Sequence, residues 1–156
     1  MAKCYEMIKL SVLFEIFRQV GFPLRLGWML IQCYIAPRRV DAFGSLSEAY
    51  ISFQGILAGC SHACAMMLAV LLAPVRETIR RFPAVKVRAL MDDVSLQWEG
   101  PVASGADVVF RAVRELCRRV APIGLLLQPN KSGYLANSIA AEKRFRKYSE
   151  CCPMDV

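Results

Sequence analysis

The first third of the chain repeats apolar residues at the spacing of α-helices. Between Tyr5 and Val20 they recur every third or fourth position, and Gly21 follows, so this pattern predicts a helix over that range. The apolar segment from Phe22 to Ala36 has a proline near its start and another after its end, which predicts a second helix.

A polar and aromatic segment follows, and its alternation is typical of strands. Arg38 to Phe43 and Glu48 to Phe53 read as two short strands joined by a turn at Gly44-Ser45. The next residues, Gln54-Gly55, open a glycine-bearing loop. Beyond this loop the pattern predicts a helix from Ser61 to Pro74 that continues, kinked, to Arg81.

The middle of the chain, from Val85 to Trp98, alternates hydrophobic and polar residues with the period of a β-strand. Asp92 and Asp93 interrupt the alternation, which predicts a strand, a tight turn carrying both acids, and a second strand. Taken alone, such a pair is better explained by an ordinary type I hairpin turn, because aspartate favours turns.

The last third predicts one long amphipathic helix and several shorter elements. The helix covers Ala103 to Val120, and Gly124 marks its end. Short strands are expected at Leu125 to Gln128 and Ser132 to Ala136, followed by a basic helix from Ser138 to Tyr148. The elements together give an α+β fold with an antiparallel sheet backed by helices.

Two adjacent carboxylates repel each other, so they need either full exposure to water or a cation between them. Their hard oxygen ligands suit Mg²⁺, which keeps several waters and takes its other ligands from one or two carboxylates and substrate phosphates. Asp92 and Asp93 are therefore candidate metal ligands.

The lengths and charges of the apolar segments argue against a membrane-spanning protein and against a secretory signal peptide. With 156 residues the chain has the length of one domain, and 56% of its residues are hydrophobic. Its longest apolar segments are nevertheless shorter than the roughly 18 to 20 residues that a spanning helix needs, so no membrane partner is expected. Charged residues interrupt the N-terminal apolar pattern, and no signal peptide is visible.

The chain is basic, with a net charge of +7 and a pI near 9.2, which favours a polyanionic partner. Solvated helix faces are the alternative explanation for its basic clusters. The clusters lie at Arg38-Arg39, Arg76 to Arg81, Arg111 to Arg119 and Lys143 to Lys147.

The seven cysteines are an odd number and unevenly spaced, which predicts reduced thiols in an intracellular compartment. Cys60, His62 and Cys64 lie close together, but no partner motif supplies a fourth zinc ligand, and a helix should begin there. We therefore expect buried small side chains at these cysteines.

Three segments, taken in order, resemble the palm of reverse transcriptases. They are Gln54-Gly55 before a helix, Met91-Asp92-Asp93 in a hairpin, and Gly124 to Lys131 beyond the next helix. Each is weak alone, but their order and spacing agree over nearly the whole chain. The methionine before the acid pair is more similar to reverse transcriptases than to viral RNA-dependent RNA polymerases.

The resemblance implies RNA-directed DNA synthesis by two-metal nucleotidyl transfer, with Mg²⁺ or Mn²⁺ held by Asp92 and Asp93. Its partners would be an RNA or DNA template-primer and deoxynucleoside triphosphates. Tyr5, Gln54 and Gly55 would shape the nucleotide site, Tyr5 as the aromatic beneath the sugar. Lys131 would offset the charge of the departing pyrophosphate.

The resemblance also implies a partial palm domain over residues 1–150 with a short tail at 151–156, without fingers or thumb. The family's first metal-binding aspartate would lie directly before Met1, so this chain is expected to bind catalytic metals poorly. A sheet without that strand has an unpaired edge, from which we expect low solubility.

Two other functions fit the same residues. One is a catalytically inactive retroelement remnant that keeps the basic surface and binds nucleic acid. The other is a small α+β domain in which the acid pair is only a turn, and it predicts no affinity for divalent cations or template-primer.

Overall fold

The computed structural model describes residues 4–57, 60–128 and 131–151, which form a mixed α+β structure with two separate antiparallel hairpins. The expected α+β class is confirmed. The elements are α1 (Cys4–Met7), α2 (Leu10–Val20), α3 (Leu24–Ile35), β1 (Asp41–Ala42), β2 (Ser45–Leu46), α4 (Ala63–Arg81), β3 (Val85–Leu90), β4 (Asp93–Trp98), α5 (Val102–Val120), η1 (Ala121–Ile123) and α6 (Ile139–Cys151).

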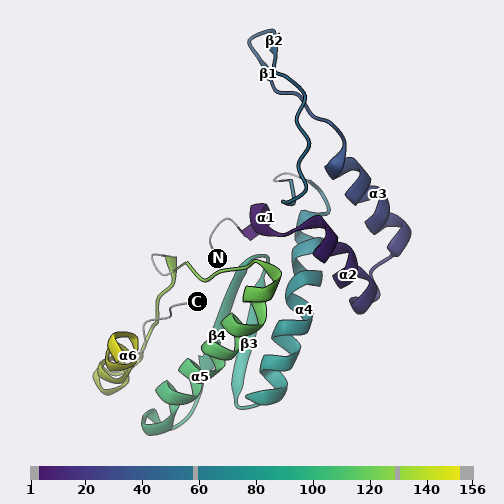
Figure 1. Ribbon diagram of the computed structural model, residues 1–156. Helices are drawn as coiled ribbons and strands as arrows, with labels where there is room; N and C mark the ends of the chain where they lie inside the picture. Colours follow the sequence, from purple (N-terminus) through teal and green to yellow (C-terminus); the bar gives the residue numbers. More distant parts are fainter. Residues whose placement is uncertain (1–3, 58–59, 129–130, 152–156) are drawn as a thin grey trace.

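The β3–β4 hairpin packs on a layer formed by α4 and α5 (Figure 1). In its register Val85 lies opposite Trp98 and Leu90 opposite Asp93. Alternate residues of both strands face the helices and are at least half-buried, while the residues between them are exposed. The predicted strand alternation is thus confirmed, because one face of the sheet is covered and the other meets solvent.

The N-terminal helix α2 packs against α4, and α3 packs against α2, which completes the core. Phe17 of α2 is fully buried, and its ring stacks on Phe22 with 4.3 Å between centroids. Gly27 of α3 lies against the same ring, where an added Cβ would come within 2.6 Å of it. The fully buried side chains with the largest volumes are Phe17, Ile8, Leu13, Met66, Met67, Leu71, Leu125, Val70 and Thr78.

The single helix expected from Tyr5 to Val20 is wrong at its start, because the backbone breaks between α1 and α2. Lys9 forms an isolated antiparallel bridge with Gln54, and the amide of Leu10 donates to the carbonyl of Phe53 at 3.2 Å. Backbone partners from a distant segment replace the helical hydrogen bonds there. Sequence periodicity carries no information about such partners.

The first hairpin is shorter than expected. In place of strands over 38–43 and 48–53, it has the two-residue strands β1 and β2 and one isolated bridge between Arg38 and Tyr50. Its turn lies at Phe43-Gly44, one residue before the expected position. This arm projects away from the other elements (Figure 1), so no layer covers its apolar side chains, and Phe43 is fully exposed.

The strands expected at 125–128 and 132–136 are also wrong, since both ranges are irregular. Leu125 is nevertheless fully buried, and its amide donates to the carbonyl of Val120 at 3.1 Å, which turns the chain back onto the core. Burial here comes from one anchored side chain. A short apolar run in the sequence fits this arrangement as well as it fits a strand.

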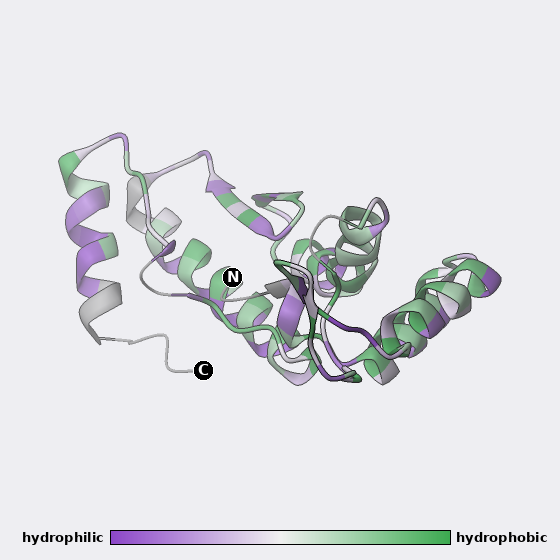
Figure 2. Cartoon of the chain, turned by 90° about the horizontal axis from the view of Figure 1, so that it is seen from above, coloured by the Kyte–Doolittle hydropathy of each residue, from purple (hydrophilic) through white to green (hydrophobic). Residues whose placement is uncertain are grey.

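The remaining helices agree with the sequence. α3, α4 and α5 match their predicted ranges, and Pro74 lies inside a helix that runs on to Arg81. α6 covers the predicted basic helix and is mostly hydrophilic, as the view from above shows (Figure 2). No helix in the described ranges is long and apolar enough to cross a lipid bilayer.

Candidate functional site

The glycine loop is joined to the α1 segment by backbone hydrogen bonds. The amide of Gly55 donates to the carbonyl of Ile8 at 2.8 Å, and that of Ile56 donates to the carbonyl of Tyr5 at 2.5 Å. Gly55 has φ of 93°, and an added Cβ would lie 3.3 Å from the backbone of Glu6. Both the left-handed backbone and the close approach require glycine at this position.

This contact brings together three residues that the sequence proposed for the nucleotide site, namely Tyr5, Gln54 and Gly55. The Tyr5 side chain is half-buried and packs against the main core. The Gln54 side chain is exposed, so its amide remains available to a ligand.

The acid pair lies at the tip of the second hairpin, in a slightly different place from the expected one. Met91 and Asp92 form the turn, while Asp93 is the first residue of β4. Asp92 is half-buried and Asp93 exposed. Within the described part of the chain, neither carboxylate forms a hydrogen bond or an ion pair, so nothing there neutralises the two charges.

The turn is not of type I, since Met91 has φ of 55° where that type has a negative value. Phe43 occupies the corresponding position in the first hairpin and has φ of 54°. Left-handed backbone suits two-residue hairpin turns because it matches the twist of the strands. The value at Met91 therefore follows from hairpin geometry and does not by itself indicate function.

The pair supplies oxygen ligands of the kind that Mg²⁺ or Mn²⁺ accepts, so the residues fit such an ion in donor type. Among the residues that the structure describes, no group of three or more His, Cys, Asp or Glu side chains is arranged to hold a metal ion. Waters and substrate phosphates would complete the coordination at Asp92 and Asp93.

The tip lies at the end of the hairpin nearer α1 (Figure 1). Val94, next to Asp93, packs against the core cluster that also contains Ile8 and Ile56. The acid pair and the Tyr5–Gly55 contact thus border one core. No hydrogen bond between described residues joins the carboxylates to Tyr5 or Gln54.

Lys131 is exposed, in the segment between η1 and α6. Its amide donates to the carbonyl of Gln128 at 3.0 Å, and its side chain makes no hydrogen bond or ion pair with the described residues. Gly124, at the other end of the motif, lies against α1, where an added Cβ would come within 3.1 Å of the Met7 carbonyl. The motif therefore touches the α1 end through its glycine.

Trp98 fixes the far end of the acidic hairpin. Its ring lies against Gly100 and Gly105, where added Cβ atoms would approach ring atoms to 2.9 and 2.4 Å. The indole nitrogen is buried and has no hydrogen-bond partner in the described structure. Packing against these glycines, and not polar contact, holds Trp98 on the first turns of α5.

Gly105→Ala is expected to destabilise the fold by about 1–2 kcal/mol, because the clash of its Cβ with Trp98 exceeds the gain in helix propensity. Thermal unfolding and near-UV circular dichroism measure the effect. Gly133→Ala is the matched control, since an added Cβ there meets nothing within 4 Å. Equal stability of the two variants would contradict the packing of Trp98 on α5.

Cys60, His62 and Cys64 lie around the start of α4. Ser61 Oγ lies 2.9 Å from His62 Nδ1, so the imidazole has a neighbouring hydroxyl as its partner. Cys64 is exposed and Cys60 half-buried, so the expected burial of these small side chains is wrong for Cys64. Of the cysteines whose side chains the structure describes, Cys33, Cys60, Cys64 and Cys117 are free thiols.

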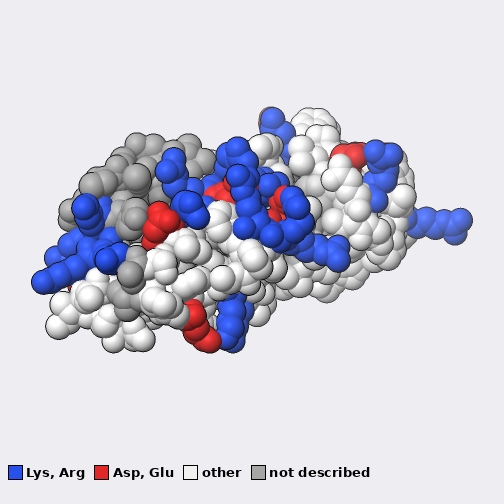
Figure 3. Space-filling view, turned by 90° about the horizontal axis from the view of Figure 1, so that it is seen from below, with Lys and Arg blue, Asp and Glu red and all other residues white. Residues whose placement is uncertain are grey.

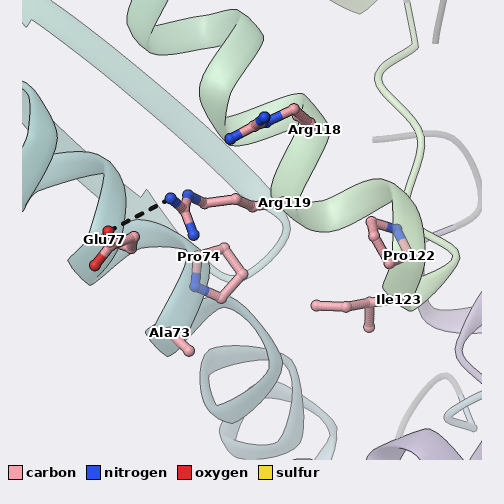
Figure 4. A pocket seen from close by; sticks show the side chains of 7 residues that line it. All are labelled: Ala73, Pro74, Glu77, Arg118, Arg119, Pro122 and Ile123. Carbon is pink, nitrogen blue, oxygen red and sulfur yellow. Dashed lines mark hydrogen bonds and ion pairs between the residues drawn. The ribbon is translucent and has the colours of Figure 1, made fainter.

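A charged network between α4 and α5 is a feature that the sequence analysis missed. Glu115 is largely buried, and its carboxylate contacts Arg119 at 2.6 Å and Arg81 and Arg118 at 3.2 Å each. Glu77 contacts Arg80 at 2.5 Å. It also contacts Arg119 at 3.4 Å (Figure 4). The spacing of Glu77 to Arg80 and of Glu115 to Arg118 and Arg119 was a visible signal for the pairs within each helix.

These contacts lower the pKa of both carboxyls. Burial alone would raise the pKa of Glu115, but the hydrogen bond from Arg119 and the charges of Arg118 and Arg81 outweigh it and hold the pKa below its usual range. The hydrogen bond from Arg80 lowers the pKa of Glu77. Both groups are therefore anions at neutral pH and hold the arginines in place.

Because the folded-state pKa of Glu115 is depressed, its stabilisation is complete above the unfolded value of about 4.3 and is lost as pH falls through the folded value. We expect Glu115→Gln to lower stability at pH 7 by about 1–3 kcal/mol and to flatten the decline of the unfolding midpoint below pH 5. Melting curves between pH 7 and pH 3 measure both effects. Glu48→Gln is the control, because Glu48 is exposed and has no ion pair in the described structure. It should change neither the stability at pH 7 nor the decline of the unfolding midpoint below pH 5.

No family model, no curated protein and no solved structure matches this chain.

Proposed function

We propose that the chain is the palm part of a reverse-transcriptase-like polymerase, which performs template-directed DNA synthesis. The observation that carries the proposal is the hydrogen-bonded contact between the Tyr5–Lys9 segment and Gln54–Ile56. The resemblance requires these distant segments to share one nucleotide site. A second support is the acid-tipped hairpin, which is backed by α4 and α5 and borders the same core.

In this proposal each residue has a definite task. Asp92 and Asp93 hold Mg²⁺ or Mn²⁺, with waters and substrate phosphates as further ligands. The bound ions would activate the attacking 3′-oxygen and stabilise the leaving pyrophosphate. The half-buried ring of Tyr5 limits space beneath the sugar, and the exposed Gln54 contacts the nucleotide or template. Lys131 offsets negative charge on the pyrophosphate.

Primer extension tests the proposal. The chain, and a version extended upstream by its own reading frame, are incubated with template-primer, deoxynucleoside triphosphates and Mg²⁺. We expect incorporation by the extended version that EDTA abolishes, and much less by the shorter chain. Metal-independent incorporation, or none by the extended version, contradicts the proposal.

The catalytically inactive remnant is the second candidate, and the arginine-rich surface over α4 and α5 favours it. It predicts salt-sensitive binding to nucleic acid without incorporation. The primer-extension experiment, run beside a binding measurement, separates the two candidates.

A further inference from the structure

Four arginines on the facing helices α4 and α5 form one surface, which we call the arginine cluster: Arg80, Arg81, Arg118 and Arg119. All four contact one or both of two carboxylates, Glu77 and Glu115, so the network as a whole carries a net charge of +2. Three of the arginine side chains are 55–77% exposed. The surface is therefore both positive and open to solvent.

The carboxylates hold the guanidinium groups in fixed orientations. Arg80 uses Nε and one terminal nitrogen on Glu77, and Arg81 uses one terminal nitrogen on Glu115. A guanidinium has five N–H donors, so each arginine keeps donors for a ligand. Because the side chains are already ordered, less rotamer entropy is lost when they bind an anion.

An open groove of about 660 Å³ runs beside the cluster between α4 and η1 (Figure 4). Arg118, Arg119 and Glu77 form its polar wall, and its apolar floor consists of Ala73, Pro74, Pro122 and Ile123. No aromatic side chain lines it, so it offers no platform on which a base could stack. Recognition there would depend on charge and on arginine hydrogen bonds.

A second basic group lies on α6, where Lys143, Arg146 and Lys147 line a smaller hollow. Seen from below, Lys and Arg side chains gather over the middle of the molecule and again at the end where α6 lies (Figure 3). Two basic groups on one face match an extended polyanion better than a compact anion.

We propose that the arginine cluster binds the phosphodiester backbone of a nucleic-acid strand, without sequence preference and without a metal ion. Arginine suits phosphate because its planar fork donates two parallel hydrogen bonds. The inference rests on the proposed function for the class of partner, but the surface is separate, since no residue of β3 or β4 lines the groove. It is a contact that holds the nucleic acid through residues other than the acid pair.

Binding of a labelled single-stranded RNA of about 20 nucleotides, measured by fluorescence anisotropy in EDTA at several salt concentrations, tests the proposal. Arg80→Gln combined with Arg118→Gln is expected to weaken binding about tenfold or more at 0.1 M salt. The slope of log K against log salt should become shallower by about 1.4, since each lost phosphate contact on a single strand removes about 0.7.

The matched control is Arg18→Gln combined with Arg25→Gln, which removes the same charge outside the cluster. Arg18 holds Glu15 through the same two nitrogens as Arg80 holds Glu77, at 3.1 and 2.9 Å. The control should bind within about twofold of the unaltered chain. Equal losses in both double variants would mean that only net charge matters, and would overturn the proposal.

Arg80→Lys combined with Arg118→Lys keeps the charge, and it should retain the salt slope even if the glutamine variant unfolds. Loss of the slope in a folded lysine variant overturns the proposal, as does an unaltered chain that does not bind RNA. Polyglutamate that displaces the RNA at equal charge concentration identifies an acidic-peptide surface instead, which also overturns it. Binding in EDTA without primer extension leaves this inference standing and contradicts only the polymerase.

Discussion

Asp93→Asn is expected to reduce Mg²⁺-dependent primer extension by the upstream-extended protein at least 100-fold, that is by about 3 kcal/mol or more of transition-state stabilisation. Asn keeps the shape of the side chain and removes its charge, so the metal loses one anionic ligand. Asp93 is exposed, and its side chain forms no hydrogen bond or ion pair with the described residues, so the fold should be unchanged. Single-nucleotide incorporation rates and a melting curve measure the two effects.

Asp107→Asn is the control for this prediction. Asp107 is partly exposed on α5 and pairs with Arg111 at 3.5 Å, so the same chemical change occurs away from the hairpin tip. Its incorporation rate should stay within about twofold of the unaltered protein. If Asp93→Asn keeps full activity, the acid pair is only a turn, and the small-domain explanation is the correct one.

Phe17→Ala is expected to destabilise the fold by about 3–5 kcal/mol, a large part of the stability of a domain of this size. Its ring is fully buried, stacks on Phe22 and fills the space against Gly27, which has no side chain to expand into the cavity. Urea denaturation, with tryptophan fluorescence as the probe, measures the change in the free energy of unfolding.

Phe14→Ala is the matched control on the same helix. Phe14 is half-buried at the margin of the core cluster, and its ring has an edge contact with Trp28, itself 54% exposed, at 5.7 Å between centroids. We expect a loss of about 1 kcal/mol. Comparable losses for the two variants would mean that the contact of α2 with α3 and α4 is not the main core.

Amphipathic periodicity predicted the elements that pack on a neighbour along one face. α3, α4, α5 and the β3–β4 hairpin were found in this way, because each buries a single stripe or face. The pattern failed where contacts between distant residues decide the backbone. Lys9 leaves the helix to pair with Gln54, and Leu125 is buried by a turn and not by a strand.

The candidate site also has one feature that was predicted before the structure and one that was not. The nearness of Tyr5 to Gln54 and Gly55 was expected only through the family resemblance, since no local pattern joins residues so far apart. The network of Glu77 and Glu115 was not foreseen. Two of its links, Arg81 to Glu115 and Arg119 to Glu77, cross between helices, and their formation depends on how α4 and α5 pack.

The order of contacts along the chain has a consequence for folding. α4, β3, β4 and α5 follow one another without interruption and touch mainly their sequence neighbours, whereas α1 reaches its partner at Gly55 only by closing a loop of nearly fifty residues. Local contacts form with little loss of chain entropy. We expect the unit from Ala63 to Val120 to nucleate the fold. The junction beside Gly55 should form last during folding and break first during unfolding.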